Sequence, residues 1–313
     1  MGTINEKINY LEETKNLIKN ALLEKGIDVS DDDTFRSYVQ KIIDYNGGFT
    51  SITDASYLFY KKARLDNMDS FMKLLNKVTS TAYMFYECNL EDVPQLDTSE
   101  CTDMSYMFYQ NPFIDFSQFN FDTSKVTNME HMFEYAGWQN NNESNPTINT
   151  SNVTRMTYMF ANTNFKKITG LDTSNVQYFN QTFSNLYDCM EIQELDMSSA
   201  ININYMFYSS FGKNSTLTTV GGLRNLGKAY TRQSTNFPDY QLRFHTFTAI
   251  SHDSLMNIVN TIYDLNLNEN LSVDGVCNYT QNILLSSNNV DKLTDEEIAI
   301  ATNKGWSVSY CLY

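Results

Sequence analysis

The sequence predicts an α/β fold in which a repeating solenoid with a parallel sheet follows an N-terminal α-helical segment. The first observation behind this prediction is a Met-Phe doublet, or a close variant, that recurs at intervals of 23 to 27 residues. The second is an amphipathic helical pattern before the repeats, and the third is an alternation of helix and strand patterns after them. A fixed period of this length is typical of chains in which each repeat buries its apolar side only against its neighbours.

The bulk composition excludes several functional classes before any motif is considered. Of the 313 residues, 42% are hydrophobic, which favours a folded chain over a disordered one. The formal net charge is -15, so the basic face that phosphate binding requires is missing, and we predict no nucleic-acid binding. No apolar run approaches the roughly 20 residues that span a bilayer, so we predict no membrane insertion. Five cysteines without metal-ligand spacing argue against a zinc site or a disulfide framework.

The first of three predicted domains, residues 1–47, is a helical segment for anchoring or oligomerisation. Over residues 3–25 the apolar positions follow a heptad pattern, which Lys15 interrupts and Gly26 ends. The candidate oligomerisation residues on this face are Ile4, Ile8, Leu11, Ile18 and Leu22. The pattern leaves open whether the helix packs on its own chain, associates with further copies or docks on a partner. A second amphipathic helix is expected after three acidic residues at 31–33, which suit a helix N-terminus.

The second predicted domain, residues 48–227, consists of the repeats. Each unit reads Leu-Asp-Thr-Ser or a close variant, followed by Met-x-x-Met-Phe, and a triplet of apolar residues spaced three apart joins successive units. We expect the triplet and Leu-Asp-Thr-Ser to form a short strand with its turn, stacked into one parallel sheet with polar ladders between repeats. We expect Met-x-x-Met-Phe to form one helical turn with its apolar side inward. Thr102, Thr127 and Thr154 are expected to cap three of these turns, and Thr127 with Glu130 to form a capping box.

These units resemble the BspA-like leucine-rich repeat, in the subclass that reads Phe-Asp-Thr-Ser-Lys-Val-Thr-Asn-Met-x-x-Met-Phe. Residues 121–133, FDTSKVTNMEHMF, match that pattern almost throughout. The resemblance covers residues 80–225 and extends more loosely over 51–79. It implies a leucine-rich-repeat-like solenoid for the second domain.

The third predicted domain, residues 228–313, consists of degenerate α/β repeat units that cap the solenoid. A cap is expected because an exposed last repeat would leave a sheet edge and a bare core. Helices are predicted over 251–265 and 293–303, and strands over 244–250, 283–285 and 306–309.

The sequence assigns no catalytic, cofactor-binding or metal-binding residue. Only three histidines are present, and His131 occupies a repeat position that tyrosine fills in other units. The chain has no Ser-His-Asp arrangement, no glycine-rich phosphate loop and no His-x-x-x-His helix. We therefore predict a protein that is not an enzyme and uses no cofactor; an enzyme within the C-terminal units is the less favoured alternative.

One residue per repeat, directly before the Met-Phe doublet, is mostly tyrosine and is predicted to form a column along the repeats. The candidate recognition residues are Tyr57, Tyr83, Tyr106, Tyr158 and Tyr205, together with Trp138 on a polar loop of the longest repeat. The pattern leaves two interpretations open, an aromatic stripe that contacts a glycan or a protein, and structural stacking beside the core. Trp138 can likewise contact a partner or fold back on the repeats.

Both ends of the chain are similar to segments of tailed-phage virion proteins of gut bacteria. The matches are INEKINYLEETK at 4–15, with Thr-Phe-Arg-Ser-Tyr at 34–38, and KLTDEEIAIATNKGW at 292–306. This resemblance, with no export signal after Met1, implies a virion structural protein such as a head fibre, capsid decoration or tail-associated component, assembled in the host cytoplasm. The implied partners are other virion proteins at the N-terminal helices, further copies in a homo-oligomer such as a trimer, and a host-surface protein or glycan. The alternative is a BspA-like bacterial cell-surface or secreted adhesin.

Overall fold

The computed structural model is a mixed α/β protein with parallel sheets and few helices, and its chain forms two compact units. The smaller unit comprises Met1–Thr53 and Asp66–Asn76, and the larger unit comprises Asp54–Leu65 and Lys77–Tyr313. The structure describes residues 15–16, 18–30, 32–34, 37–38, 41, 52–62, 72, 75–140, 145–208, 216–230, 242–273, 276–277 and 281–310.

In the smaller unit, a helix ends where the sequence predicts, at Gly26. The φ of Gly26 is +77°, and the amide of Ile27 donates to the carbonyl of Leu22 at 3.0 Å, which satisfies an otherwise free helix carbonyl. Leu22 is buried with Ile27, Val29 and Tyr38, and Ile18 packs partly buried against them. The two described candidates for oligomerisation, residues 18 and 22, therefore contact their own unit; the candidates Ile4, Ile8 and Leu11 lie outside the described residues.

The second helix of this unit begins with a cap from threonine. The Oγ1 atom of Thr34 accepts a hydrogen bond from the amide of Ser37 at 3.1 Å. Asp33 instead accepts from Ser30 and Ser37, and its carboxylate lies 2.8 Å from the ammonium of Lys41. The hydrogen bond from Lys41 and that from the Ser30 amide hold the pKa of Asp33 well below its usual value.

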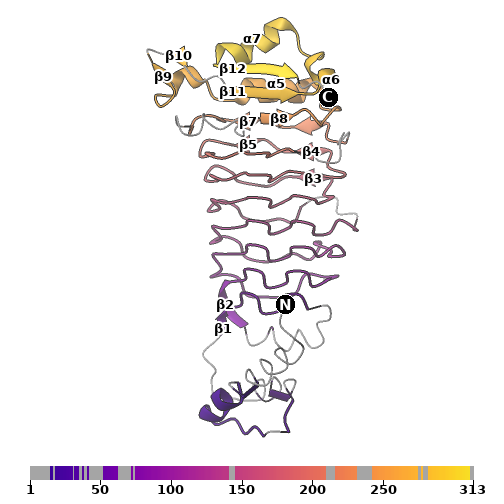
Figure 1. Ribbon diagram of the computed structural model, residues 1–313, viewed down its shortest axis with the longest axis vertical. Coiled ribbons are helices and arrows are strands. Elements are labelled where there is room, and N and C mark those ends of the chain that lie inside the picture. Colours follow the sequence, from indigo (N-terminus) through magenta and orange to yellow (C-terminus); the bar gives the residue numbers. More distant parts are fainter. Residues whose placement is uncertain are drawn as a thin grey trace, which may run out of the picture. The chain divides into compact units, whose positions relative to one another are not determined.

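In the larger unit, successive repeats stack on one another, as the parallel turns of the chain in Figure 1 show. The chain passes from the smaller to the larger unit within β1 (Ile52–Asp54) and again within β2 (Leu75–Ser80), and these strands form a two-stranded sheet. Parallel bridges then join one residue of each repeat to the next, through Ser80, Asp103, Asn128, Arg155, Tyr178 and Asn202. Two further parallel sheets are β3 (Lys167–Ile168), β4 (Glu191–Ile192) and β6 (Thr219–Val220), and β5 (Leu195–Asp196) with β7 (Leu223–Arg224).

The prediction of one parallel sheet was therefore wrong in its extent. Pairing is parallel, but it is divided among several narrow ladders in which each repeat contributes one or two residues. The reason lies in the tight turns that interrupt the extended segments, because a residue with positive φ cannot continue a strand.

The Met-Phe segment does not form the predicted helical turn. The residue before the doublet has a positive φ in every repeat, for example 58° at Tyr83 and 58° at Tyr106, whereas a right-handed helix needs a negative φ. Instead, hydrogen bonds alternate between local turns and the next repeat. The amide of Met84 donates back to Thr81 at 3.0 Å, while the amides of Tyr83 and Phe85 donate to the following repeat at 2.9 and 3.1 Å.

The predicted threonine caps and the capping box were also wrong. The Oγ1 atoms of Thr102, Thr127 and Thr154 donate to a backbone carbonyl of the preceding repeat, at 3.2 to 3.3 Å. The amide of Glu130 donates to the side-chain oxygen of Asn128 at 3.1 Å, not to Thr127. These hydroxyls thus join repeats, because there is no helix N-terminus at this point for them to cap.

The predicted inward side of the Met-Phe doublets is confirmed. Both residues of each doublet from Met84 to Phe160 have no exposed surface. The phenylalanine rings form a continuous column, with ring centroids of successive repeats 5.5 to 6.2 Å apart, made of Phe59, Phe85, Phe108, Phe133, Phe160, Phe183 and Phe207. Each buried ring contributes about 1.5–3 kcal/mol to folding, so this column is the main core of the repeats.

The predicted polar ladder is confirmed for threonine. The buried hydroxyls of the Leu-Asp-Thr-Ser units donate to a carbonyl of the next repeat at 2.8 to 3.0 Å, from Thr98, Thr123, Thr150 and Thr173. The Asp and Ser residues act within one repeat instead. For example, the amides of Ser124 and Ser174 donate to the carboxylates of Asp122 and Asp172, and the hydroxyl of Ser174 donates to Asp172 as well, which closes a short turn.

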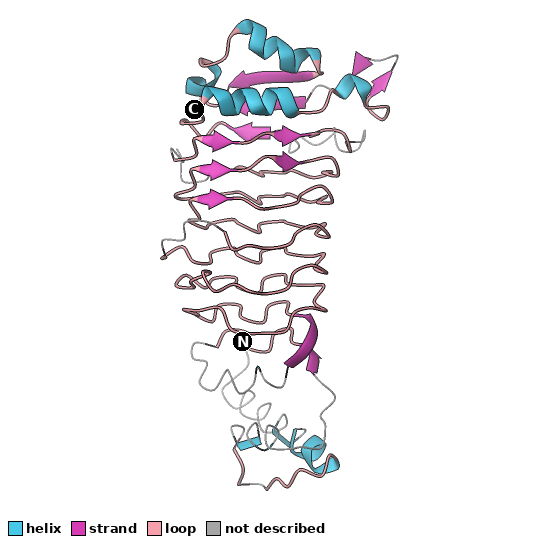
Figure 2. Cartoon of the chain, turned by 180° about the vertical axis from the view of Figure 1, so that it is seen from behind, coloured by secondary structure: helices cyan, strands magenta, loops and turns pink. Residues whose placement is uncertain are grey.

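The C-terminal part continues the repeats with longer elements, shown from behind in Figure 2. They are β8 (Leu242–Phe244), α5 (His252–Thr261), η2 (Leu265–Leu267), β9 (Ser272–Val273), β10 (Val276–Cys277), β11 (Gln281–Leu285), α6 (Ser287–Val290), α7 (Asp295–Asn303) and β12 (Trp306–Tyr310). Strand β11 pairs in parallel with β8 and with β12. The ring of Phe244 stacks 4.4 Å from Phe207, so the phenylalanine column extends into this sheet.

The helices predicted in this part are confirmed with shorter bounds. Ser251 caps α5, and Thr294 caps α7 through a capping box with Glu297. The strand predicted over 244–250 ends at Phe244, because a turn closed by Phe247 follows it. Within the described residues, every helix is too short or too polar to cross a membrane.

Candidate functional site

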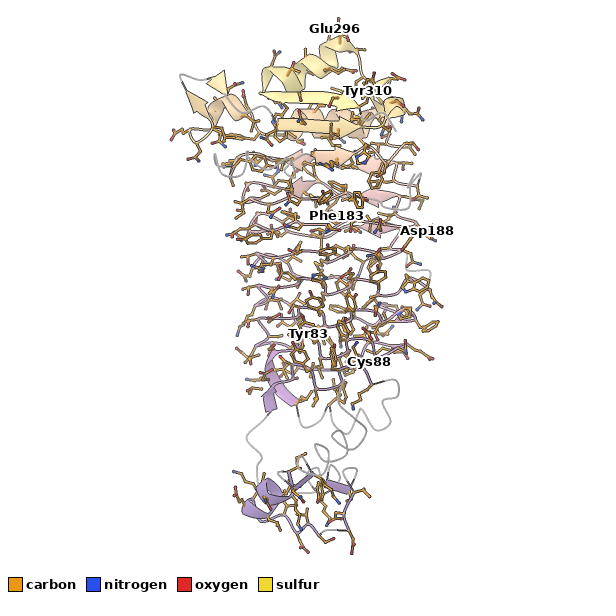
Figure 3. All side chains as sticks on the ribbon, viewed as in Figure 1. Tyr83, Cys88, Phe183, Asp188, Glu296 and Tyr310 are labelled. Atoms are coloured by element: carbon orange, nitrogen blue, oxygen red, sulfur yellow. The ribbon has the colours of Figure 1, made fainter. Side chains whose placement is uncertain are left out.

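The predicted tyrosine column is present over five successive repeats. Ring centroids of neighbouring repeats are 4.1 to 4.6 Å apart with nearly parallel planes, along Tyr57, Tyr83, Tyr106, His131 and Tyr158. Figure 3 labels Tyr83 among the side chains of the stacked repeats. We call this set the first column.

The residues of the first column have a strained backbone conformation. Each member is the third residue of a four-residue turn, a position at which positive φ is needed in a type II turn. For a residue with a side chain this conformation costs about 1–2 kcal/mol. The cross-repeat hydrogen bonds and the ring stacking hold it in place. Strain of this kind is maintained only where the surrounding structure determines it.

Tyr205 occupies the same repeat position but does not stack in the first column. Gln181 fills the position between it and Tyr158, and its side-chain amide donates to the Tyr158 hydroxyl. The ring of Tyr205 instead lies 5.1 Å from the guanidinium of Arg243. The structure therefore brings four of the five predicted tyrosines together and separates the fifth.

A second column, which the sequence reasoning missed, runs beside the first. It contains Tyr60, Tyr86 and Tyr109, with centroids 4.8 and 4.5 Å apart, and it ends at Tyr135, whose ring meets Tyr109 edge-on at 6.0 Å. The two columns contact each other at ring-centroid distances of 5.7 to 6.4 Å. A tyrosine directly after the Met-Phe or Leu-Phe pair in three successive repeats is the signal that could have revealed this column.

Neighbouring rings of the columns cover one another, so few ring faces are open to solvent. Tyr57 is 55% exposed and Tyr60 36% exposed, whereas the inner members are half-buried because each ring is covered by its neighbours. Burial raises the pKa of Tyr83, Tyr86 and Tyr106 above the usual value, so these phenols stay protonated at neutral pH. The stacking is thus structural for the ring faces, and it leaves a row of partly exposed tyrosine side chains along the repeats.

His131 fits the interpretation of a repeat position. Its ring lies between Tyr106 and Tyr158 in place of a tyrosine, and its Nδ1 atom contacts the carboxylate of Glu134. Glu134 is 6% exposed, so the histidine gives this buried carboxylate a partner.

Trp138 lies outside both columns and is 43% exposed. It lines a surface hollow together with Tyr135, Asn164, Tyr187 and Asp188. The sequence marked Trp138 alone, because Asn164, Tyr187 and Asp188 come from later repeats and share no local pattern with it.

The described part of the chain holds no group of three or more His, Cys, Asp or Glu side chains arranged for a metal ion. The thiols of Cys88, Cys101 and Cys189 are free and buried. Burial raises the pKa of the Cys189 thiol to about 12, which keeps it protonated and unreactive.

The repeats are the part of the chain that matches a known family. One family model matches residues 53–167 and again 115–220, and together these matches span more than half of the chain. The model is DUF285, described as a Mycoplasma protein of unknown function. The chain belongs to the DUF285 family. No curated protein and no solved structure matches it.

The DUF285 region contains both tyrosine columns and all five residues of the hollow. The surface features described above therefore belong to the repeats that define the family, and the C-terminal elements from β8 onward lie beyond the match.

Proposed function

We propose that this DUF285 protein is a non-enzymatic structural protein of a bacteriophage virion, a head fibre, capsid decoration or tail-associated component. In this proposal the larger unit is a leucine-rich-repeat-like solenoid that presents a surface for protein or glycan recognition. The N-terminal helical segment anchors it to other virion proteins or joins further copies, and the protein is assembled into particles in the host cytoplasm.

The observation that carries the recognition role is the pair of tyrosine columns. They place partly exposed tyrosine side chains at equivalent positions of successive repeats, on a surface that extends along the stack, which suits contact with an extended or repeating partner. Tyrosine contributes large contact area at low entropic cost and is enriched at protein interfaces. The similarity of residues 4–15 and 292–306 to phage virion proteins supports the virion assignment.

The oligomerisation part of the proposal now rests on fewer residues. Leu22 is buried in its own unit, so contact with further copies would involve Ile4, Ile8 and Leu11. An Ile8→Asp, Leu11→Asp double variant is expected to be monomeric in light scattering if these residues meet their symmetry mates. An unchanged mass would reject this interface.

Mass spectrometry and cryo-electron microscopy of purified particles test the virion assignment. We expect the protein at a fixed copy number per particle, with the repeats resolved as a projection. Absence from particles purified to constant composition would reject the assignment.

The second candidate function is a bacterial cell-surface or secreted adhesin of the BspA-like type. It is favoured by the family description, which names a protein of a bacterium. Protease treatment of intact cells that carry the gene in its natural context distinguishes the two. Cleavage at the cell surface without particle production would support the adhesin.

A further inference from the structure

The hollow beside Trp138 has a volume of about 430 Å³ and is open to solvent. This volume lies within the range of about 300–1,000 Å³ that is usual for small-ligand sites. Its walls are three aromatic side chains, Tyr135, Trp138 and Tyr187, with Asn164 and Asp188. Trp138 is 43% exposed and Tyr187 42% exposed, so these rings present surface that no neighbouring repeat covers.

The walls of the hollow are held by hydrogen bonds from three repeats. The amide of Gly137, next to Trp138, donates to the carbonyl of Asn111 at 2.9 Å, and the amide of Tyr187 donates to that of Thr163 at 3.1 Å. The side-chain amide of Asn164 donates to the carbonyls of Trp138 and Asn140, at 3.1 and 2.5 Å. The backbone that carries the aromatic walls is therefore held in place before a ligand binds, which lowers the entropic cost of binding.

The polar groups at the hollow are hydrogen-bond acceptors. Asp188 is exposed and is labelled at the margin of the larger unit in Figure 3. Asn164 is 8% exposed, and its Oδ1 atom has no hydrogen-bond partner, while the two bonds made by Nδ2 fix which atom is the oxygen. A buried acceptor without a partner costs about 1–3 kcal/mol. Oδ1 is enclosed by its neighbours, so a ligand donor reaches it only after a rim side chain changes rotamer, as commonly happens on binding.

We propose that this hollow is a binding site for a neutral sugar unit of a glycan. The apolar C–H face of the sugar ring packs on Trp138 or Tyr187, and its hydroxyls donate to the carboxylate of Asp188. This inference rests on the proposed recognition function and names its ligand class.

Two other ligand chemistries fit the hollow less well. A quaternary ammonium group would suit the aromatic walls and the negative charge of Asp188, but it carries no N–H or O–H to donate to the unpartnered Oδ1 atom of Asn164. An acidic sugar would bring a negative charge to Asp188, on a protein whose formal net charge is -15. A neutral sugar supplies both an apolar face and several donors.

Binding of the full chain to an array of neutral, sialylated and sulfated oligosaccharides provides the first test. We expect retention by neutral glycans, and the best of them is then titrated against the indole fluorescence. Of the two tryptophans, Trp306 is 1% exposed, so a ligand-induced change reports Trp138. Failure of every neutral glycan, preferential retention by acidic glycans, or displacement of the bound sugar by choline would each overturn the proposal.

Variants of the lining residues provide the second test. Tyr187→Ala and Asp188→Asn are expected to weaken binding of the titrated sugar at least about tenfold, equivalent to about 1.4 kcal/mol. The matched control is Tyr310→Ala, which removes a tyrosine of similar exposure, 52%, outside the hollow, and it should leave the affinity unchanged. Equal affinities for all three variants would overturn the site.

The two proposals can fail independently. If the purified protein binds the sugar but is absent from particles, the virion assignment is rejected and the sugar site is kept. If the protein is present in particles but no neutral glycan retains it, the sugar site is rejected and the virion assignment is kept.

Discussion

The phenylalanine column inside the repeats and the two tyrosine columns at their surface have the same period and lie a few residues apart in the chain. Ring centroids within the inner column are 5.5 to 6.2 Å apart, and its members from Phe85 to Phe183 have no exposed surface. In the first tyrosine column the rings are closer, at 4.1 to 4.6 Å, yet they are only half-buried. Close stacking is therefore not a measure of burial in this protein.

The difference shows that one repeat unit performs two tasks with adjacent residues. The phenylalanines sit on the inner side of the coil and remove apolar area from water. The tyrosines of the first column occupy turns with positive φ, which aim successive rings outward in register at a conformational cost. The inner column should therefore dominate stability, and the outer columns should matter more for surface properties.

The largest effect is expected from removing one inner ring. Phe133 is fully buried and stacks on Phe108 and Phe160, so Phe133→Ala should destabilise the larger unit by about 3–5 kcal/mol through lost burial and a cavity. Urea unfolding followed by circular dichroism measures this loss. Tyr109→Ala is the matched control from the second column, and an equal loss in both variants would contradict the division of tasks.

A smaller effect is expected at the threonine ladder. The buried hydroxyl of Thr123 donates to the carbonyl of Asn149 at 3.0 Å and accepts from its amide at 2.7 Å. Thr123→Val keeps the volume but leaves both backbone groups unpaired, so we expect a loss of about 1–3 kcal/mol in the same unfolding experiment. Thr123→Ser retains the hydroxyl and should lose less; the reverse order would contradict the ladder.

The strained turns of the first column can be tested by comparing two truncations of one residue. Tyr106 has a φ of 58°, so Tyr106→Gly should be more stable than Tyr106→Ala by about 1 kcal/mol, although both lose the ring. Elsewhere glycine is normally the less stable of the two by about 0.5–1 kcal/mol. Tyr86, a described residue without positive φ, supplies that control pair, and the same order at both positions would argue against strain.

The tyrosine columns also predict how stability depends on alkaline pH. Burial raises the pKa of Tyr83, Tyr106 and Tyr158 in the folded protein, so the folded state keeps protons that the unfolded state releases above pH of about 10. Their contribution is complete below that pH and is lost as pH rises through the higher folded values. Phenolate absorbance of the folded protein should therefore appear at a higher pH than that of the urea-unfolded chain. Titration of the folded and unfolded protein at the same pH would contradict the prediction.

Much of the fold was predictable because its dominant interactions repeat. The inward doublets, such as Met84 with Phe85, and the C-terminal helices follow apolar spacing that the sequence displays directly. The local conformation of the Met-Phe segment was not predictable in the same way. Its apolar spacing is also compatible with a helical turn, and tyrosine or histidine at the turn position carries no signature of positive φ, unlike glycine.

The candidate site was predictable only in part. The first column follows from one repeat position in the sequence. Gln181 ends the ring stacking before Tyr205, and Tyr205 instead contacts Arg243, which only the three-dimensional packing determines. The hollow depends on Trp138, Asn164 and Tyr187 meeting across repeats. No spacing in the sequence indicates that these side chains lie together, because loops of unequal length determine where each of them is placed.

The backbone bonds between repeats have a consequence for how such a protein can change over generations. Each repeat donates some amide hydrogens to the next repeat, as Tyr83 does, and others to the one before, as Thr127 does, and this pattern recurs along the repeats. A gene that duplicates or deletes one whole unit restores every one of these bonds at the new junction. Duplication or deletion of whole repeats can therefore lengthen or shorten the aromatic surface by one repeat at a time, while the side chains that each repeat contributes stay the same.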